Sequence, residues 1–151
     1  MNAFVRRAQR DDTPTLRLLE TEARDQLTKF RGGDRLGLEV PIVGDHWAER
    51  INSNEWLVLV AGFDAEALGY LCVKFAPPTG APLIEVVYVT DGARQLGLGD
   101  GLVTAAIAEC RKRGATEIDA YALPGDRETK NLFERSGLTA RLLIASKNIE
   151  E

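Results

Sequence analysis

The sequence predicts an α/β fold: a single domain over residues 1–151, with a mixed, mostly antiparallel central sheet flanked by helices. Three observations lead to this prediction. The length of 151 residues is that of one ordinary domain. Three apolar, β-branched runs follow one another between residues 56 and 89, which is typical of an antiparallel meander. After Gly92 the apolar residues change to helical spacing and another strand follows, which indicates one right-handed crossover.

The N-terminal third predicts one strand and two helices. Residues 4–9 form a short extended run. A helix begins at the capping residues 11–13, with a proline in its first turn, and ends at residues 31–33. Its apolar stripe consists of Leu16, Leu19, Ala23, Leu27 and Phe30. The stretch up to Gly44 is irregular and predicts no long element, whereas residues 45–51 predict a short helix.

The meander supplies three strands in the middle of the chain. Residues 56–63 (WLVLVAGF) are so apolar and β-branched that they predict a buried strand. The turn at 64–66 joins them to a second strand at 68–75, which makes a hairpin. Residues 77–80 (PPTG) break the chain, and residues 82–89 predict the third strand.

The rest of the chain predicts two helices and two strands. The first helix has an apolar stripe formed by Leu98, Leu102, Ala105, Ala106 and Cys110. It ends at residues 111–114, where three cations precede a glycine. Residues 116–123 predict a strand, residues 126–136 a helix stopped by Gly137, and residues 138–146 a closing strand. The apolar character of that last strand would suit the edge of a homodimer.

Composition excludes several classes of function. Nineteen Lys and Arg against 23 Asp and Glu leave a net charge of −4, which argues against nucleic acid as the main partner. Cys72 and Cys110 lie in apolar stretches and indicate a reducing compartment, and the single His46 cannot build a usual zinc site, so no metal is expected. We find no apolar run long enough for a membrane span and no signal-peptide core, and therefore expect a cytoplasmic protein without membrane partners.

The segment 83–103 (LIEVVYVTDGARQLGLGDGLV) is the one most informative about function. Its glycines at 97, 99 and 101 lie where a strand and loop meet the start of a helix. Glycines there let the backbone approach a bound group closely, and the helix start offers unpaired N–H groups with a partial positive charge. This arrangement favours a bound phosphate. A tight turn without any ligand would account for the glycines equally well.

Two familiar nucleotide-binding loops fit this segment poorly. A Walker A loop needs Gly-Lys-Ser/Thr at its end, and nothing similar follows Gly99. A dinucleotide fingerprint starting at Gly97 would place Leu102 at its last glycine. Asp119 lies about 20 positions on, which leaves a Rossmann interpretation open, but the loop follows a meander and does not open a first βαβ unit.

The same segment resembles the acyl-CoA loop of the GNAT superfamily of N-acyltransferases. That pattern is Arg or Gln, two residues, Gly, one residue, and Gly or Ala, and here it is Arg94-Gln95-Leu96-Gly97-Leu98-Gly99. Tyr88-Val89 ends a strand five residues before the arginine, as in the family. The resemblance extends over almost the whole chain, is most specific over residues 85–138 and is weak before Trp56. It implies a GNAT-like fold and transfer of an acetyl group from acetyl-CoA to a primary amine, by direct attack in a ternary complex.

The resemblance also implies which residues bind acetyl-CoA. Val87 and Val89 would pair through their backbone with the pantetheine arm, and residues 95–100 would hold the pyrophosphate through amide N–H groups. Asp126 occupies the place of an asparagine that often contacts the cofactor, although its role as a helix N-cap is sufficient explanation. The complete expected set is Val87, Tyr88, Val89, Arg94, Gln95, Leu96, Gly97, Leu98, Gly99, Asp100, Asp126 and Lys130.

The chain departs from the family pattern in its charges and in its proton donor. Arg94 is the loop's only cation, and Asp100 would repel a pyrophosphate; Arg127 and Lys130 could compensate, or be ordinary solvated charges. Phe133 occupies the place of a tyrosine that protonates the leaving thiolate in many GNAT enzymes. Tyr121 is the candidate substitute, and a structural tyrosine is the other interpretation.

Glu85 is the candidate base. Strand alternation predicts that it shares a face with Leu83 and Val87, so that a carboxylate interrupts an apolar row. Burial would raise its pKa and make it a better base, and the family often has a base or water-activating glutamate here. The alternative is a glutamate that faces solvent or pairs with an arginine across the sheet.

A second class of function is also compatible with the sequence. A non-catalytic acyl-CoA-binding sensor or interaction module is favoured by Phe133 and by the scarcity of cations in the loop. The acceptor, a small-molecule or peptide amine, cannot be identified, because residues 31–45, where the family holds the acceptor, show the weakest resemblance.

Overall fold

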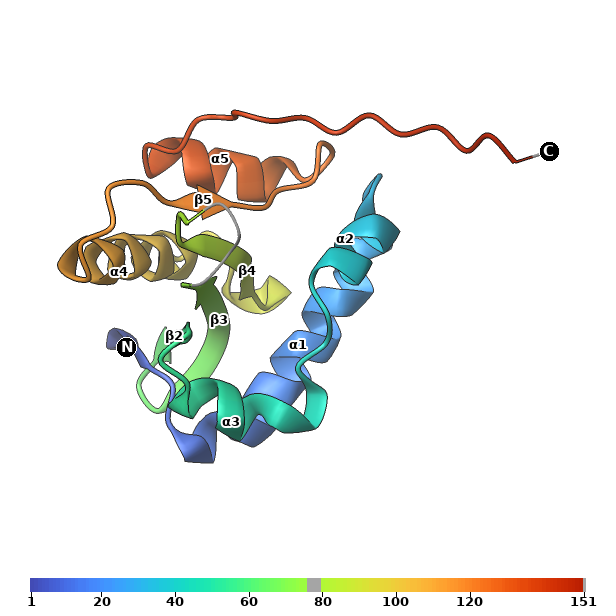
Figure 1. Ribbon diagram of the computed structural model, residues 1–151. Coiled ribbons are helices and arrows are strands. Elements are labelled where there is room, and N and C mark those ends of the chain that lie inside the picture. The colour runs from blue at the N-terminus through green and yellow to red at the C-terminus, as the bar shows by residue number, and fades with distance from the viewer. Residues whose placement is uncertain (76–79, 151) are drawn as a thin grey trace.

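A five-stranded sheet lies between two layers of helices in the computed structural model, which describes residues 1–75 and 80–150 (Figure 1). Strands β1 to β4 are antiparallel to their neighbours, and β5 runs parallel to β4. The predicted fold class is therefore confirmed. The strands, in sheet order, are β1 (Ala3–Arg7), β2 (Trp56–Phe63), β3 (Glu66–Lys74), β4 (Leu83–Val89) and β5 (Asp119–Ala120).

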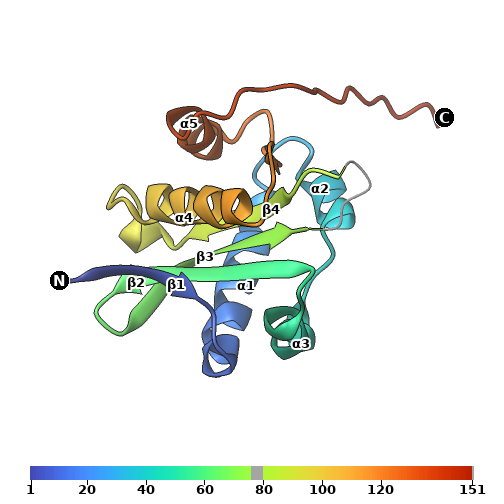
Figure 2. The same ribbon diagram turned by 60° about the vertical axis from the view of Figure 1, so that its left-hand side comes forward.

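The helices cover both faces of the sheet, with α1 and α3 on one side and α4 on the other (Figure 2). Their bounds are α1 (Thr13–Leu27), α2 (Gly33–Glu39), α3 (Trp47–Asn52), α4 (Leu98–Lys112) and α5 (Arg127–Arg135). Short 3-10 turns occur at Arg10–Asp12, Gly44–His46 and Asp91–Ala93. Within the described residues, none of these helices has the length and apolar character that crossing a membrane requires.

Each face of the sheet has its own apolar core. The α4 side is built from alternate strand residues such as Leu57, Leu59 and Leu71, together with the stripe of α4. On the α1 and α3 side, Trp47 packs edge-on against Tyr70 with their ring centroids 5.7 Å apart, and both side chains are fully buried. Successive side chains along β2 and β3 therefore point into the two cores in turn, because helices cover both faces of these central strands.

The predicted closing strand at 138–146 is wrong. This segment forms no strand and runs away from α5 along the outside of the molecule (Figure 1), with Leu142, Leu143 and Ile144 exposed. The predicted strand at 116–123 shortens to the two residues of β5. Because β5 is so short, its edge offers few backbone groups to a further strand. Residues 138–146 therefore form no strand beside it, despite their apolar pattern.

Helix α2 lies in the stretch where no long element was predicted. It begins after Gly32, whose φ of +84° suits glycine, and it is held from outside by Arg24 of α1. The Arg24 guanidinium donates hydrogen bonds to the carbonyls of Gly37, at 2.9 Å, and of Val40. A seven-residue helix containing two glycines depends on such tertiary contacts, which the sequence pattern does not reveal. The predicted break at 77–80 lies largely in residues 76–79, outside the described residues.

Candidate active site

Strands β4 and β5 separate after a very short parallel contact. Leu83 pairs with Asp119 and Ile84 with Ala120, and the Tyr121 N–H donates to the carbonyl of Ile84 at 3.1 Å. The later residues of β4 pair with β3 alone among the described residues. The sheet therefore opens along one edge of β4.

The backbone of Val87 and Val89 faces this opening. The N–H of Thr90 donates to the carbonyl of Leu68 on the β3 side, at 2.9 Å. Because successive residues of a strand point their backbone groups to opposite edges, those of Val89 and Val87 point away from β3. The Val89 carbonyl accepts a hydrogen bond from Arg94 Nε at 3.0 Å. An extended ligand could pair with the remaining groups as an added strand does.

The side chain of Tyr88, between the two valines, turns to the other face of the sheet. Its hydroxyl donates to Glu22 of α1 at 3.0 Å, and burial, reinforced by this contact, raises the pKa of Tyr88 to about 12. The hydroxyl of Thr90 donates to the same carboxylate at 2.8 Å. These contacts fix the end of β4 against α1 just before the glycine loop.

The glycine loop ends in a helix start that is open to an anion. Gln95 and Gly97 have φ values of +64° and +85°, and α4 begins at Leu98 without a side-chain cap on its first N–H groups. Leu96 is exposed, whereas Leu98 is buried in the core. The free N–H groups of the first turn are the features that bind phosphate at helix starts.

Ion pairs modify the expected charge of this loop. Arg94 lies 3.1 Å from both Asp91 and Glu128, so the loop's only cation is already paired. Asp100, expected to repel a pyrophosphate, is paired with Arg135 of α5 at 3.1 Å. On α5, Asp126 caps the helix by accepting from the backbone N–H and hydroxyl of Thr129, at 3.1 and 2.7 Å. Lys130 donates to the carbonyl of Pro124, and Arg127 is exposed.

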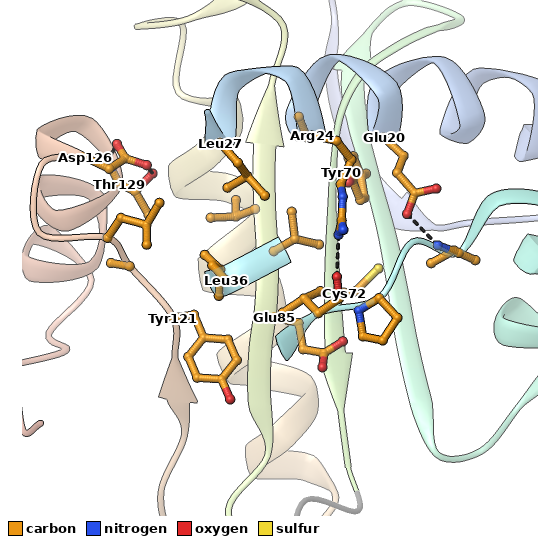
Figure 3. A pocket seen from close by; sticks show the side chains of 18 of the residues that line it. Glu20, Arg24, Leu27, Leu36, Tyr70, Cys72, Glu85, Tyr121, Asp126 and Thr129 are labelled. Carbon is orange, nitrogen blue, oxygen red and sulfur yellow. Dashed lines mark hydrogen bonds between the residues drawn. The ribbon is translucent and has the colours of Figure 1, made fainter. Parts of the chain in front are cut away.

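Glu85 is buried, but on a different face from the one predicted. The register of β3 and β4 shifts, so that Cys72 pairs with Val86 and Val73 with Ile84, and Glu85 has no partner opposite it. This bulge turns Glu85 to the α1 and α3 side, whereas Val87 packs into the α4 core. The carboxylate therefore does not interrupt the row that contains Val87; it faces a cavity (Figure 3).

That cavity has a volume of about 80 Å³ and lies between the opened sheet and helices α1 to α3. Two charged residues of α1 shape its walls without being free for a ligand. Glu20 accepts from the N–H groups of Val43 and Gly44 at 2.8 and 2.9 Å, and Arg24 is held by carbonyls of the α2 segment (Figure 3). Further lining residues are Tyr70, Cys72, Glu85, Tyr121 and Thr129.

Glu85 is a charged group of this cavity whose hydrogen-bonding capacity is not used by the described residues. Among the described residues its Oε1 is buried and has no hydrogen-bond partner. Burial raises the pKa of Glu85, and the nearest cation, Arg50 of α3, lies 4.0 Å away and counteracts this only in part. Such a carboxylate can take a proton from a bound group near neutral pH.

The comparisons with known proteins agree with this geometry. The model of the acetyltransferase (GNAT) family matches residues 17–138. The chain belongs to this family. None of the curated protein sequences is significantly similar to it.

Solved structures with the same fold have low sequence identity. A transcriptional regulator from Bacillus halodurans C-125 is 22% identical, with a TM-score of 0.69 over 98% of this chain and 100% of that one. An aminoglycoside acetyltransferase from an uncultured soil sample, solved with sisomicin, is 21% identical, with a TM-score of 0.69 over 99% and 96%. A predicted acetyltransferase from Clostridium acetobutylicum, solved with acetyl-CoA, is 13% identical, with a TM-score of 0.69 over 98% and 97%.

Two aromatic residues considered for proton chemistry lie in different parts of the structure: Tyr121 is beside the cavity and Phe133 is away from it. Phe133 is buried in the α4 core. Tyr121 is 38% exposed and lies across the cavity from Glu85 (Figure 3), and burial raises its pKa. Cys72 also lines the cavity, but burial raises its pKa to about 12, so it remains a neutral thiol.

Sequence reasoning did not identify Trp47 and Arg50. Both come from α3, three residues apart on one helix face, and both line the cavity. The available signal was that spacing within a short helix, followed closely by Trp56, on which Arg50 stacks.

Proposed function

We propose that the protein is an N-acetyltransferase that moves the acetyl group of acetyl-CoA to a primary amine by direct attack in a ternary complex. The observation that carries the proposal is the unpartnered, buried carboxylate of Glu85 beside the opened edge of β4, within the described residues. Family membership supports acetyl transfer in general. The acceptor and the roles of individual residues are part of the proposal.

Acetyl-CoA would be held by backbone groups more than by side-chain charge. The edge of β4 at Val87 and Val89 would pair with the pantetheine arm, and the start of α4 would accept the pyrophosphate. The Val89 N–H would donate to the thioester carbonyl oxygen and stabilise the charge that develops there.

Glu85 would remove the proton from the acceptor, directly or through a water molecule. Its raised pKa suits a base that must work near neutral pH. Tyr121 is the hydroxyl group available to protonate the leaving thiolate, because Phe133 cannot do so. No covalent enzyme intermediate is required.

Two measurements test this proposal. Calorimetry should show similar affinities for CoA and acetyl-CoA, because the loop binds the pyrophosphate and not the acetyl group. NAD and ATP should bind much more weakly, because they lack the pantetheine arm. A thiol-release assay with acetyl-CoA and a panel of amines should then show turnover. A preference for NAD would overturn the assignment. Tight CoA binding without turnover on any amine would favour the non-catalytic acyl-CoA sensor, an alternative that Phe133 supports.

A further inference from the structure

Arg50 is a partly buried cation whose charge is not fully used within the protein. Its side chain is 17% exposed, and its guanidinium lies flat against Trp56, 3.5 Å from the ring centroid. The closest carboxylate oxygen, Oε1 of Glu85, lies at 4.0 Å, beyond hydrogen-bond distance. In the described residues no oxygen atom accepts a hydrogen bond from Arg50, whose remaining polar neighbour is the thiol of Cys72. A guanidinium fixed in this way is prepared to bind an anion.

A second unused donor lies beside it. The Nε1 of Trp47 is fully buried and has no hydrogen-bond partner among the described residues. Trp47, Arg50 and Glu85 line the same cavity. Leaving buried polar groups unpaired is unfavourable, so a ligand that pairs with them gains affinity.

The charges of Glu85 and Arg50 and the free N–H donor of Trp47 select the form of that ligand. Glu85 needs a donor or a cation, whereas Arg50 and Trp47 need an acceptor or an anion. A zwitterion satisfies both requirements within one small molecule. A polycation would leave Arg50 unsatisfied and would place like charges together in a poorly solvated cavity.

Cavity size agrees with this selection. At roughly 10–15 Å³ for each water-sized position, 80 Å³ corresponds to about five to eight such positions. That matches an amine nitrogen, an α-carbon and a carboxylate.

We propose that the acceptor is a free α-amino acid or a closely similar small amino carboxylate, whose carboxylate binds Arg50 while its amine faces Glu85; this rests on the proposed function. Glu85 takes a proton from the ammonium group and later releases it to solvent. The bond between the amine nitrogen and the acetyl carbon forms, the bond between that carbon and the CoA sulfur breaks, and the sulfur leaves with the electron pair. The nitrogen loses its second proton as the amide forms, and this loss balances the proton that the thiolate gains.

The test compares acceptors that differ at the carboxylate, and it adds two polycations. We would measure kcat/KM with acetyl-CoA for alanine, alaninamide and ethylamine, which differ only at the carboxylate. The two polycations are spermidine and an aminoglycoside. Alanine should be preferred on the order of 10- to 100-fold, as expected for charge-assisted hydrogen bonds to the carboxylate. Screening all proteinogenic amino acids would then identify the favoured side chain.

Variants at Arg50 connect this preference to the residue. Arg50→Met should reduce the ratio of kcat/KM for alanine to kcat/KM for alaninamide on the order of 10- to 100-fold, with acetyl-CoA affinity preserved. The ratio is the readout because Arg50 also acts on the pKa of Glu85, which affects both acceptors alike. Arg50→Lys should retain part of the preference and serves if the methionine variant does not fold. Arg113→Met is the matched control, since Arg113 also stacks on an aromatic ring, that of Phe75 at 3.9 Å, away from the cavity.

The outcomes separate this inference from the function on which it rests. Turnover of spermidine, an aminoglycoside or alaninamide above that of alanine would overturn the inference and leave the acetyltransferase intact. An unchanged preference for alanine in a folded Arg50 variant would also overturn it. Binding of acetyl-CoA without turnover on any amine would overturn both.

Discussion

Asp100 and Arg135 form an ion pair between the first turn of α4 and the last turn of α5, with Arg135 Nε 3.1 Å from Asp100 Oδ1. A second contact, from Nη2 to Oδ2 at 3.3 Å, makes the pair bidentate. The sequence predicts that the carboxylate of Asp100 repels a pyrophosphate. In the structure this charge is neutralised by Arg135, which lies 35 positions away in the sequence.

Removing Arg135 should weaken CoA binding without unfolding the protein. Arg135→Gln exposes the charge of Asp100 at the helix start, an effect of about 0.3–1 kcal/mol, and should raise the Kd of acetyl-CoA about two- to fivefold at low salt. Asp100→Asn should lower this Kd by a similar factor. Stability should barely change, since exposed pairs contribute little.

Calorimetry at two salt concentrations measures both effects. Arg111→Gln, at the far end of α4, is the control and should have no effect on the Kd. Weaker binding by Asp100→Asn would show instead that this carboxylate helps to bind the cofactor.

The glycine loop offers a test of backbone conformation. Gly97 has a φ of +85°, and a Cβ there would meet nothing within 4 Å, so the obstacle to a side chain is the backbone and not space. Gly97→Ala should lower the free energy of unfolding by about 1–2 kcal/mol, and should weaken CoA binding by displacing the N–H groups of α4. Gly92→Ala, also in open space but without a positive φ, should change neither. Urea unfolding of both variants measures the free energy of unfolding, and calorimetry measures their CoA affinity.

Periodicity predicted the elements that have long apolar patterns. The stripes of α1 and α4 and the runs of β2 and β3 form as expected, because each pattern is long enough to define its period. The loop with its helix start was predictable for the same reason, since three closely spaced glycines interrupt a clear change of period.

The features that sequence reasoning missed depend on partners distant in the chain. An alternating pattern cannot show where a bulge adds a residue, so the face of Glu85 was predicted incorrectly. A Cβ at Gly99, in the first turn of α4, would come within 3.2 Å of Leu132, a contact between distant segments that no local pattern shows. The tail at 138–146 has a strand pattern, but the edge beside it is only two residues long.

A partly buried ion pair near the N-terminus should make stability depend on acid pH. Arg6 donates to both carboxylate oxygens of Asp12, at 2.7 and 2.9 Å, and this contact lowers the pKa of Asp12. A lowered pKa means that the stabilisation is present above the unfolded-state pKa and is lost as pH falls through the folded-state value.

Asp12→Asn should therefore lower the free energy of unfolding by about 1–3 kcal/mol at pH 7, and by much less below about pH 3. Urea unfolding at both pH values measures the difference. Asp45→Asn is the control, because Asp45 also pairs with an arginine, Arg17, but both side chains are mostly exposed. Equal losses for the two variants at pH 7 would contradict the role given to burial.

Replacing the candidate base should separate activity from stability. Glu85→Gln should lower kcat by about 10²- to 10⁴-fold and leave acetyl-CoA affinity nearly unchanged. The pKa of Glu85 is raised, so the carboxyl group stabilises the fold at low pH and this contribution is lost as pH rises through the folded-state pKa. Near pH 8 the glutamine variant should thus be at least as stable as the wild type. A less stable variant with wild-type turnover would identify Glu85 as a structural charge.

The pH profile of kcat tests Glu85 and Tyr121 together. The rate should rise with pH as Glu85 loses its proton, and the Glu85→Gln variant should lack that step.

Tyr121 lines the same cavity as Glu85. Burial raises the pKa of Tyr121, and the nearby charge of Glu85 adds to this effect, so the two groups lie within interacting range. If Tyr121 protonates the thiolate, the rate should fall at a pH higher than about 10, the ordinary tyrosine pKa, because the pKa of Tyr121 is raised. Tyr121→Phe should remove this fall and lower kcat. We expect both effects, because Phe133 leaves its position without a proton donor and Tyr121 has a hydroxyl beside the cavity. A profile that stays level above pH 10, with full activity in Tyr121→Phe, would mean that water protonates the thiolate.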